Sequence, residues 1–119
     1  EIAIRATFVA SFSSKQTVVL APTTVLASQL FDCFNNRLSS FGILVDRFYR
    51  NSSKTSTLDG FLNKKTDVLI CTHAILRKTE VLKQCSLFIV EGNFHTPFML
   101  SWSHFDKGDI GSSIFCSYW

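Results

Sequence analysis

Apolar and polar residues follow one another along this chain in blocks that predict alternating helices and strands. Residues 1–12 place apolar side chains around most of the girth of a helix, which predicts a helix sandwiched between other layers. Residues 17–21 form a continuous apolar, β-branched run of the kind that is buried on both faces of a parallel sheet. Pro22 ends this run, because proline cannot donate a hydrogen bond to a neighbouring strand.

The same order of strand and helix repeats further along the chain. Thr23 or Thr24 can cap a helix that runs to about Ser40, and a stretch that ends in Gly42 closes it. The pattern then predicts one short helix and three further strands, at residues 58–62, 43–48, 67–70 and 86–90. Strands and helices that alternate through short loops predict a right-handed parallel α/β sheet.

The composition changes after Glu91. Residues 92–119 carry three charged and seven aromatic side chains, with neither a helical nor an alternating period. Glycine and serine interrupt the segment, so we expect an irregular C-terminal tail with exposed aromatic side chains. The predicted organisation is a folded domain at residues 1–91 and a tail of unrelated or frameshifted character at 92–119.

Composition narrows the class of protein without deciding its partner. The chain has 119 residues, enough for one domain, and its 12 Lys and Arg against 9 Asp and Glu give a net charge of +3. This charge is compatible with a polyanionic partner but is no dense basic patch. No apolar run approaches the roughly 20 residues of a membrane span, so no membrane partner is expected. The cysteines show no Cys-x-x-Cys spacing, which predicts reduced thiols and no metal site.

Two motifs place polar residues directly after predicted strands. They are Ala21-Pro-Thr-Thr-Val-Leu-Ala-Ser-Gln29 and Thr66-Asp-Val-Leu-Ile-Cys-Thr-His-Ala-Ile-Leu76. Because parallel strands end at one edge of a sheet, Thr23, Thr24 and Thr72 should share one surface. Hydroxyl groups and backbone amides at helix starts suit phosphate oxygens, and His73 could add a further donor.

Each of these residues also has a plainer interpretation. Thr23 and Thr24 would be ordinary helix caps in any α/β protein. A solitary histidine such as His73 is commonly a satisfied loop or core residue. The basic pairs at residues 64–65 and 77–78 are most simply solvated faces. The complete pattern, rather than any single residue, favours the phosphate-contact interpretation.

From residue 1 to about residue 90 the chain resembles the first RecA-like motor domain of the transcription-repair coupling factor family, a group of superfamily 2 DNA translocases. The resemblance rests on the two motifs above, on Arg47-Phe48 between them, and on the apolar Leu-Phe-Ile-Val strand that follows, in the order of the family. The branched-DNA fork-reversal helicases share most of this pattern, but usually have glutamate after Pro-Thr and lack the Arg-Phe pair.

The resemblance implies a partial RecA-like P-loop NTPase fold that contacts double-stranded DNA. Its full-length members use ATP and Mg²⁺, contact RNA polymerase, and work in the bacterial cytoplasm, or in the plastid of a plant. The residues that it implies along the DNA backbone are Thr23, Thr24, Gln29, Arg47, Thr72 and His73. Arg47 is expected in a third loop at the same sheet edge. Cys71 stands where the family has glycine, so a requirement for positive φ or close backbone approach would strain it.

The catalytic motifs depart from the family. ATP hydrolysis in P-loop motors needs a glycine-rich loop that ends in Gly-Lys, together with carboxylates for Mg²⁺ and water. The sequence contains no Gly-x-x-x-x-Gly-Lys, and Glu91 followed by Gly92 is a degenerate remnant of the acidic motif. We therefore expect no catalysis, and no bound ATP or Mg²⁺, for this chain alone. The P-loop strand is not recognisable either, so the four predicted strands would expose an apolar edge.

Three functional hypotheses follow from the sequence. The first is a fragment of an ATP-dependent DNA translocase of transcription-coupled repair that retains its DNA-contacting motifs. The second is a non-enzymatic protein- or nucleic-acid-binding module that self-associates through the sheet edge or the aromatic tail. The third is a non-functional truncated gene product.

Overall fold

The computed structural model describes residues 2–49, 54–90 and 114–116. Its centre is a five-stranded sheet of order β2-β3-β1-β4-β5, in which every neighbouring pair is parallel. The strands are β1 (Thr17–Leu20), β2 (Val45–Phe48), β3 (Val68–Cys71), β4 (Leu87–Val90) and β5 (Ile114–Cys116). The predicted parallel α/β class is confirmed, and β1 to β4 lie close to their predicted bounds.

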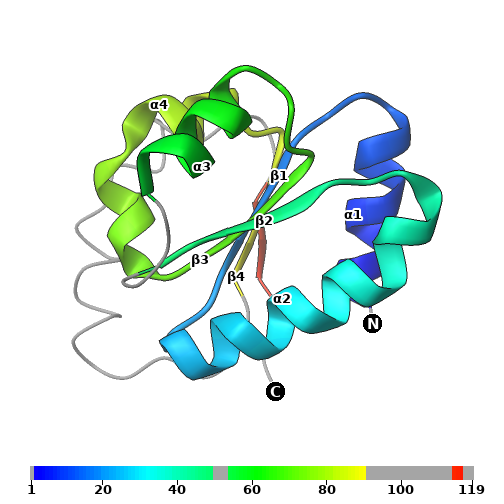
Figure 1. The fold of residues 1–119 in the computed structure, drawn as a ribbon, viewed down its shortest axis with the longest axis horizontal. Coiled ribbons are helices and arrows are strands. Elements are labelled where there is room, and N and C mark those ends of the chain that lie inside the picture. Colours follow the sequence, from blue (N-terminus) through cyan, green and yellow to red (C-terminus); the bar gives the residue numbers. More distant parts are fainter. Residues whose placement is uncertain (1, 50–53, 91–113, 117–119) are drawn as a thin grey trace.

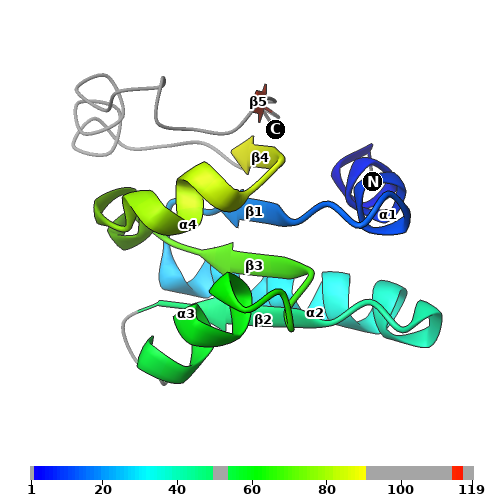
Figure 2. The same ribbon diagram turned by 90° about the horizontal axis from the view of Figure 1, so that it is seen from above.

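Helices cover both faces of the sheet, as Figures 1 and 2 show. One face carries α1 (Ile2–Phe12) and α2 (Thr24–Leu38), and α2 continues into the short 3-10 helix η1 (Ser39–Phe41). The other face carries α3 (Lys54–Leu62), the 3-10 helix η2 (His73–Arg77) and α4 (Thr79–Gln84). The sequence pattern predicted α1, α2 and part of α3, and it did not predict η2 or α4.

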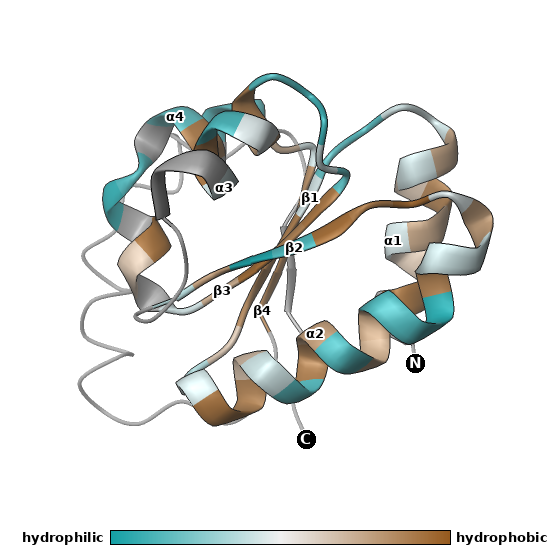
Figure 3. Ribbon diagram, viewed as in Figure 1, coloured by the Kyte–Doolittle hydropathy of each residue, from teal (hydrophilic) through white to brown (hydrophobic). Residues whose placement is uncertain are grey.

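Alternating side chains along the strands build a separate apolar core on each face. Val18 and Leu20 belong to the core under α3 and α4, where Phe61 and Phe88 are fully buried. Val19 belongs to the opposite core, together with buried residues of α2. Figure 3 shows the central strands as mostly hydrophobic, with a hydrophilic stretch on β2. Burial on both faces explains why β1 and β3 read as continuous apolar runs in the sequence.

Helix α1 packs on one face of the sheet and is not sandwiched, so that prediction is wrong. Ile4 and Thr7 are buried, but 64% of Val9 and 68% of Phe12 are exposed. An apolar side chain can be buried only where a second layer lies over it, and no described element covers the outer side of α1 (Figure 2). The uniform apolar girth of α1 therefore leaves a hydrophobic surface in solvent.

The C-terminal tail supplies a fifth strand, which corrects two expectations. Residues 114–116 are not irregular, since Ile114, Phe115 and Cys116 lie in register beside Phe88, Ile89 and Val90 of β4. The edge of β4 offers unpaired backbone donors and acceptors, and a short apolar segment can satisfy them by pairing. The expected bare edge is thus covered beside β4. The predicted tail outside these three residues, with Glu91, lies outside the described part of the chain.

A buried polar network fastens the amino end of β1 to the α3 and α4 side. The Gln16 side-chain amide donates to the carbonyl oxygens of Phe61, at 2.7 Å, and Thr66, at 2.8 Å. The Gln84 amide donates to Gln16 Oε1 at 2.7 Å and to the Phe61 carbonyl at 2.8 Å. The Gln16 carbonyl oxygen accepts from the backbone amide of Ser86 at 2.9 Å. Gln16 thereby forms hydrogen bonds with two other parts of the chain, at residues 61–66 and 84–86, outside the strand pairings.

Candidate nucleic-acid interface at the carboxyl edge of the sheet

The parallel register brings the two sequence motifs to one edge of the sheet. Leu20, the last residue of β1, is paired with Cys71 at the end of β3 and with Val90 at the end of β4. Phe48 ends β2 at the same level as Cys71. The backbone amide of Ala21 donates to the Cys71 carbonyl at 2.8 Å, so the segments that continue β1 and β3 separate only after this hydrogen bond. The loop at residues 21–23 and the loop at Thr72 are therefore neighbours, as predicted.

Thr23 is the N-cap of α2. Its backbone is extended, and its side-chain oxygen accepts a hydrogen bond from the Leu26 amide at 3.1 Å. The plainer interpretation of Thr23 as a helix cap is thus correct. It is compatible with a ligand contact, because a hydroxyl that accepts one hydrogen bond keeps its own proton for donation. Thr24, the first residue of α2, has an exposed side chain beside it.

Thr72 lies between β3 and η2 and is only 7% exposed. Its carbonyl accepts from the Ile75 amide at 3.1 Å, whereas its side chain makes no capping hydrogen bond to η2. His73 is the first residue of η2. The chain turns here directly from the strand into a 3-10 helix, which sets residues 72 and 73 at the sheet edge beside the β1 loop.

Arg47 lies within β2 and not in a loop after it, contrary to the expectation. It pairs with Ile70, one residue before the strand end, and its backbone amide donates to Asp46 Oδ1 at 2.8 Å. Its guanidinium carbon lies 4.8 Å from the centre of the Phe31 ring on α2, within cation–π range. Arg47 is exposed, so this contact leaves the guanidinium on the surface of the α1 and α2 face.

Gln29 is exposed in the second turn of α2. The structure thus gathers four of the predicted residues at one edge: Thr23, Thr24, Thr72 and His73. Arg47 and Gln29 lie on the adjoining elements β2 and α2. Arg47 is one residue before the end of its strand, and Gln29 lies beyond the first turn of its helix.

Cys71 is not strained, and the concern about its replacement of glycine is wrong. It is the last residue of β3, it is fully buried, and the positive-φ residues among those described are Ser14, Gly42 and Lys64. Its thiol lies 3.3 Å from the Val19 carbonyl, to which it donates. Burial, with a smaller contribution from Cys85, raises the pKa of the Cys71 thiol well above its ordinary value. Cys71 is therefore a neutral core residue.

Sequence reasoning missed three residues that the structure brings to this region. Phe31 supports Arg47, and no local motif marks it, since only the fold sets α2 against β2. Arg77 ends η2 and Lys78 follows it, and both are exposed on the segment that begins at Thr72. In the sequence these two residues are only a basic pair. Because η2 was not predicted, the sequence did not indicate that they belong to the segment that starts at the sheet edge.

The described residues provide no cluster that would hold Mg²⁺. In the ranges 2–49, 54–90 and 114–116, no three His, Cys, Asp or Glu side chains come together. Glu91, the remnant of the acidic motif, lies outside these ranges. Mg²⁺ in nucleotide sites is usually held by one or two carboxylates together with water and phosphate oxygens. The described residues therefore show no acidic cluster for the family's metal.

The parallel sheet, the helices on both faces and the polar loops at the carboxyl edge define the RecA-like class of motor domain. Solved structures that share the fold include the following two. The helicase domain of Pyrococcus furiosus Hef matches with a TM-score of 0.63 and 19% identity, over 98% of this chain and 24% of that chain. The C-terminal domain of the DEAD-box protein Dbp5 matches with a TM-score of 0.61 and 15% identity, over 99% of this chain and 71% of that chain.

The sequence places the chain within a particular family. The family described as DEAD/DEAH box helicase matches residues 1–92, and the chain belongs to it. The chain is similar to the transcription-repair-coupling factors of Borreliella burgdorferi, at 38% identity, and of Bacillus subtilis and Escherichia coli, at 36%, each over 94 residues. The match covers 76% of this chain and 8% of each relative. The predicted resemblance to the coupling factors is thereby confirmed.

None of the helices in the described residues is long and apolar enough to cross a membrane.

Proposed function

We propose that this chain is part of the motor domain of a transcription-repair coupling translocase, and that its carboxyl edge contacts the backbone of double-stranded DNA. One observation carries the proposal: the pairing of Leu20 with Cys71 sets the Thr23–Thr24 loop beside Thr72 and His73. Two phosphate-binding loops at one height can follow successive phosphates of one strand, and such contacts need no particular base sequence.

The chemistry of this edge suits an anionic backbone. Helix α2 has 15 residues and no acidic residue in its first turn, so its amino end offers backbone amides and a positive dipole. Thr24 adds an exposed hydroxyl, and Arg77 and Lys78 add positive charge on the segment that follows Thr72. Arg47, stacked on Phe31, extends the positive surface towards β2.

Catalysis belongs to the full-length family and not to this chain alone. Because the sequence contains no Gly-x-x-x-x-Gly-Lys, we expect it neither to bind ATP and Mg²⁺ productively nor to hydrolyse ATP. Residues 1–91 would form the partial motor domain, and residues 92–119 a tail of separate origin. RNA polymerase contact and the bacterial cytoplasm are proposed for the full-length protein on the strength of its bacterial relatives.

A non-enzymatic binding module is the second candidate, and the exposed apolar surface of α1 favours it. Such a module would use the fold as a platform and would bind through that surface. The two edge strands of the sheet are β2 and β5, and pairing through β2 would involve the charged Asp46 and Arg47. Charged residues on an edge strand oppose such pairing.

The test is the affinity of the full chain for a fluorescent DNA duplex, measured by anisotropy over a series of salt concentrations. We expect binding that weakens steeply with salt, and a loss of about tenfold for Thr72→Ala with His73→Ala. The matched control is Ser39→Ala with Ser40→Ala, which removes two exposed hydroxyls at the far end of α2. Equal losses in both variants, or binding that salt does not weaken, would refute the proposal.

A further inference from the structure

An arginine and an aromatic ring meet on the outer surface of the α1 and α2 face. The guanidinium carbon of Arg47, on β2, lies over the Phe31 ring of α2, 4.8 Å from its centre. Phe31 is half-buried and packs against the core of this face, whereas Arg47 is exposed. The ring is therefore the fixed member of the pair, and the arginine side chain rests on it.

The contact holds the charge of Arg47 without neutralising it. Asp32 and Asp46 are the carboxylates next to the pair in the sequence, and neither forms an ion pair with Arg47. Asp46 accepts from the backbone amide of Arg47, and strand alternation places its side chain on the other face, with Phe48. Within the described part of the chain, the guanidinium has the Phe31 ring as its partner. A ring face attracts a cation but carries no net charge, so the positive charge of Arg47 remains available.

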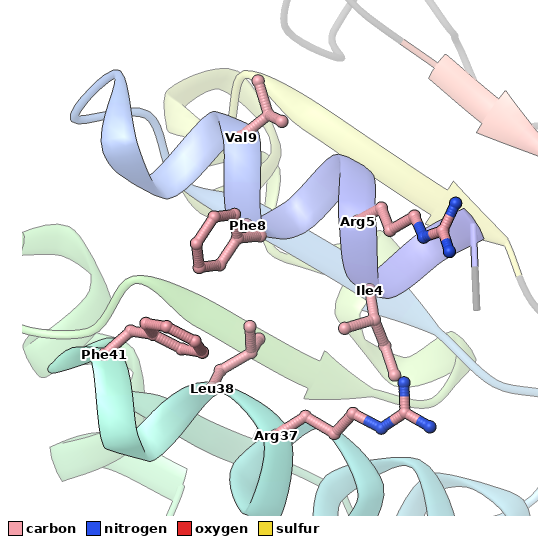
Figure 4. Close-up of a pocket in the computed structure, with 7 residues that line it drawn as sticks. All are labelled: Ile4, Arg5, Phe8, Val9, Arg37, Leu38 and Phe41. Carbon is pink, nitrogen blue, oxygen red and sulfur yellow. The ribbon is translucent and has the colours of Figure 1, made fainter.

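Other arginines of the same face differ in this respect. Arg5 and Arg37 border a hollow of about 370 Å³ between α1 and the end of α2 (Figure 4), and each already has an interaction partner in the structure. The Arg47 side chain, in contrast, donates no hydrogen bond to any residue that the structure describes. The N–H donors of its guanidinium are therefore free to bind an anion.

The pair lies within reach of a duplex bound at the carboxyl edge of the sheet. Phe31 stands about two turns beyond Thr24, the first residue of α2, which is about 10 Å along the helix axis. Arg47 is one residue before the end of β2. A duplex carries a phosphate about every 3.4 Å of its axis on each strand, so a duplex that contacts Thr24 presents further phosphates to Arg47.

We infer that Phe31 is a positioning residue for a DNA-backbone contact made by Arg47, an inference that rests on the proposed function. An unsupported arginine has several rotatable bonds and loses this freedom when it binds a phosphate. The Phe31 ring restricts the guanidinium before the DNA arrives, so less freedom is lost on binding. Phe31 thus strengthens duplex binding without itself contacting the DNA.

The test measures the affinity of the full chain for a fluorescent duplex by anisotropy, over a series of salt concentrations. Arg47→Gln removes the charge, and it should weaken binding by about fivefold and lower the slope of log affinity against log salt by about one. Phe31→Leu keeps the charge, and it should weaken binding by about threefold with an unchanged slope. Phe31→Tyr keeps the ring and should change the affinity by less than about 1.5-fold.

A double variant separates positioning from a general effect on the fold. In the Arg47→Gln background, Phe31→Leu should have almost no further effect, because the side chain that Phe31 positions is gone. The matched control is Leu30→Val, at the neighbouring half-buried residue of α2 on the same core, which should leave the affinity unchanged. If Phe31→Leu fails to fold, Arg47→Lys decides: it keeps the charge, loses the planar guanidinium and should weaken binding as Phe31→Leu would.

A measurement without DNA separates failure of this inference from failure of the proposed function. NMR relaxation of the Arg47 Nε–H group in the free chain should show a lower order parameter in Phe31→Leu than in the unchanged chain and in Phe31→Tyr. Equal order parameters, or equal losses of affinity from Phe31→Leu with and without Arg47, would overturn the inference and leave the DNA proposal standing. An ordered Arg47 in a chain that binds no duplex would refute the proposed function, and this inference with it.

Discussion

The two faces of the sheet differ in how completely they are closed. Under α3 and α4, Phe61, Phe88 and Ile75 are fully buried, and the Gln16 and Gln84 amides satisfy the carbonyl groups at the margin. Under α1 and α2, the strands are equally buried, but Val9, Phe12 and Phe41 remain in solvent. Stability should therefore reside mainly on the α3 and α4 side, while the α1 side is available for contacts. This contrast can be tested by pairs of substitutions that compare the closed core under α3 and α4 with the exposed side chains of α1 and α2.

The largest difference is expected for a pair of phenylalanine substitutions. Phe61→Ala empties a fully buried site under α3 and should lower the free energy of unfolding by about 3–5 kcal/mol. Phe12→Ala, on the exposed side of α1, should change it by less than about 0.5 kcal/mol. Urea unfolding followed by circular dichroism measures both. Similar losses in the two variants would mean that the exposed side of α1 contributes as much to stability as the core under α3.

The polar network at the closed face should contribute the next largest effect. Gln16→Ala removes the side-chain donor to the Thr66 carbonyl, one of the donors to the Phe61 carbonyl, and the acceptor of the Gln84 amide. It should cost about 2 kcal/mol, because buried polar groups lose a partner. The control is Gln29→Ala, an exposed glutamine of α2, which should be nearly neutral. The same unfolding experiment applies, and a neutral Gln16→Ala would show that water replaces the network without loss.

The buried thiol of Cys71 should make the closed face sensitive to alkaline pH. Burial raises the pKa of Cys71 above 9.0, so the unfolded chain releases its thiol proton first as the pH rises past this value. The folded state then binds more protons, and stability must fall with a slope of at most about 1.4 kcal/mol per pH unit for this group. Unfolding between pH 8 and pH 10 should show a shallower decline in Cys71→Val than in the exposed-site control Cys33→Val. Identical slopes would show that Cys71 does not contribute to the pH dependence of stability.

The smallest effects are expected to be the same on the two faces. Ser14 follows α1 with φ of 59°, and Lys64 follows α3 with φ of 62°. The left-handed region is costly for residues with a side chain, so Ser14→Gly and Lys64→Gly should each stabilise the fold by about 0.5 kcal/mol. Ser13→Gly, at a neighbouring position outside that region, should give no gain. A gain at only one site would tie this strain to the packing of its face.

Continuous apolar runs made the sheet predictable. Burial on both faces could be predicted from the apolar run at residues 17–21 and from the strands near Val68 and Leu87. Gly42, with φ of 75°, ends the helical segment where the sequence indicated. The order of the motifs along the chain predicted which loop follows which strand. Because parallel strands end together, the meeting of the Thr23 and Thr72 loops could be predicted from residue types alone.

Other features depend on tertiary contacts that no local pattern encodes. Whether the outer side of α1 is buried depends on which layers lie over it. The apolar residues on all sides of this helix therefore led to a wrong prediction of its burial. The pairing of residues 114–116 with β4 joins segments far apart in the sequence, within a tail that has no period. The contact of Arg47 with Phe31 requires α2 to lie against β2, which places the arginine on a face and not in a loop.

The measurement that tests the central claim most directly is amide hydrogen exchange of the full chain with and without a DNA duplex at low salt. We predict slower exchange at residues 22–26 and 72–78, where the backbone amides of the α2 start and of η2 would meet phosphates. Protection there should disappear at high salt, because the contacts are electrostatic. No protection at either segment, or protection confined to α1, would contradict the account.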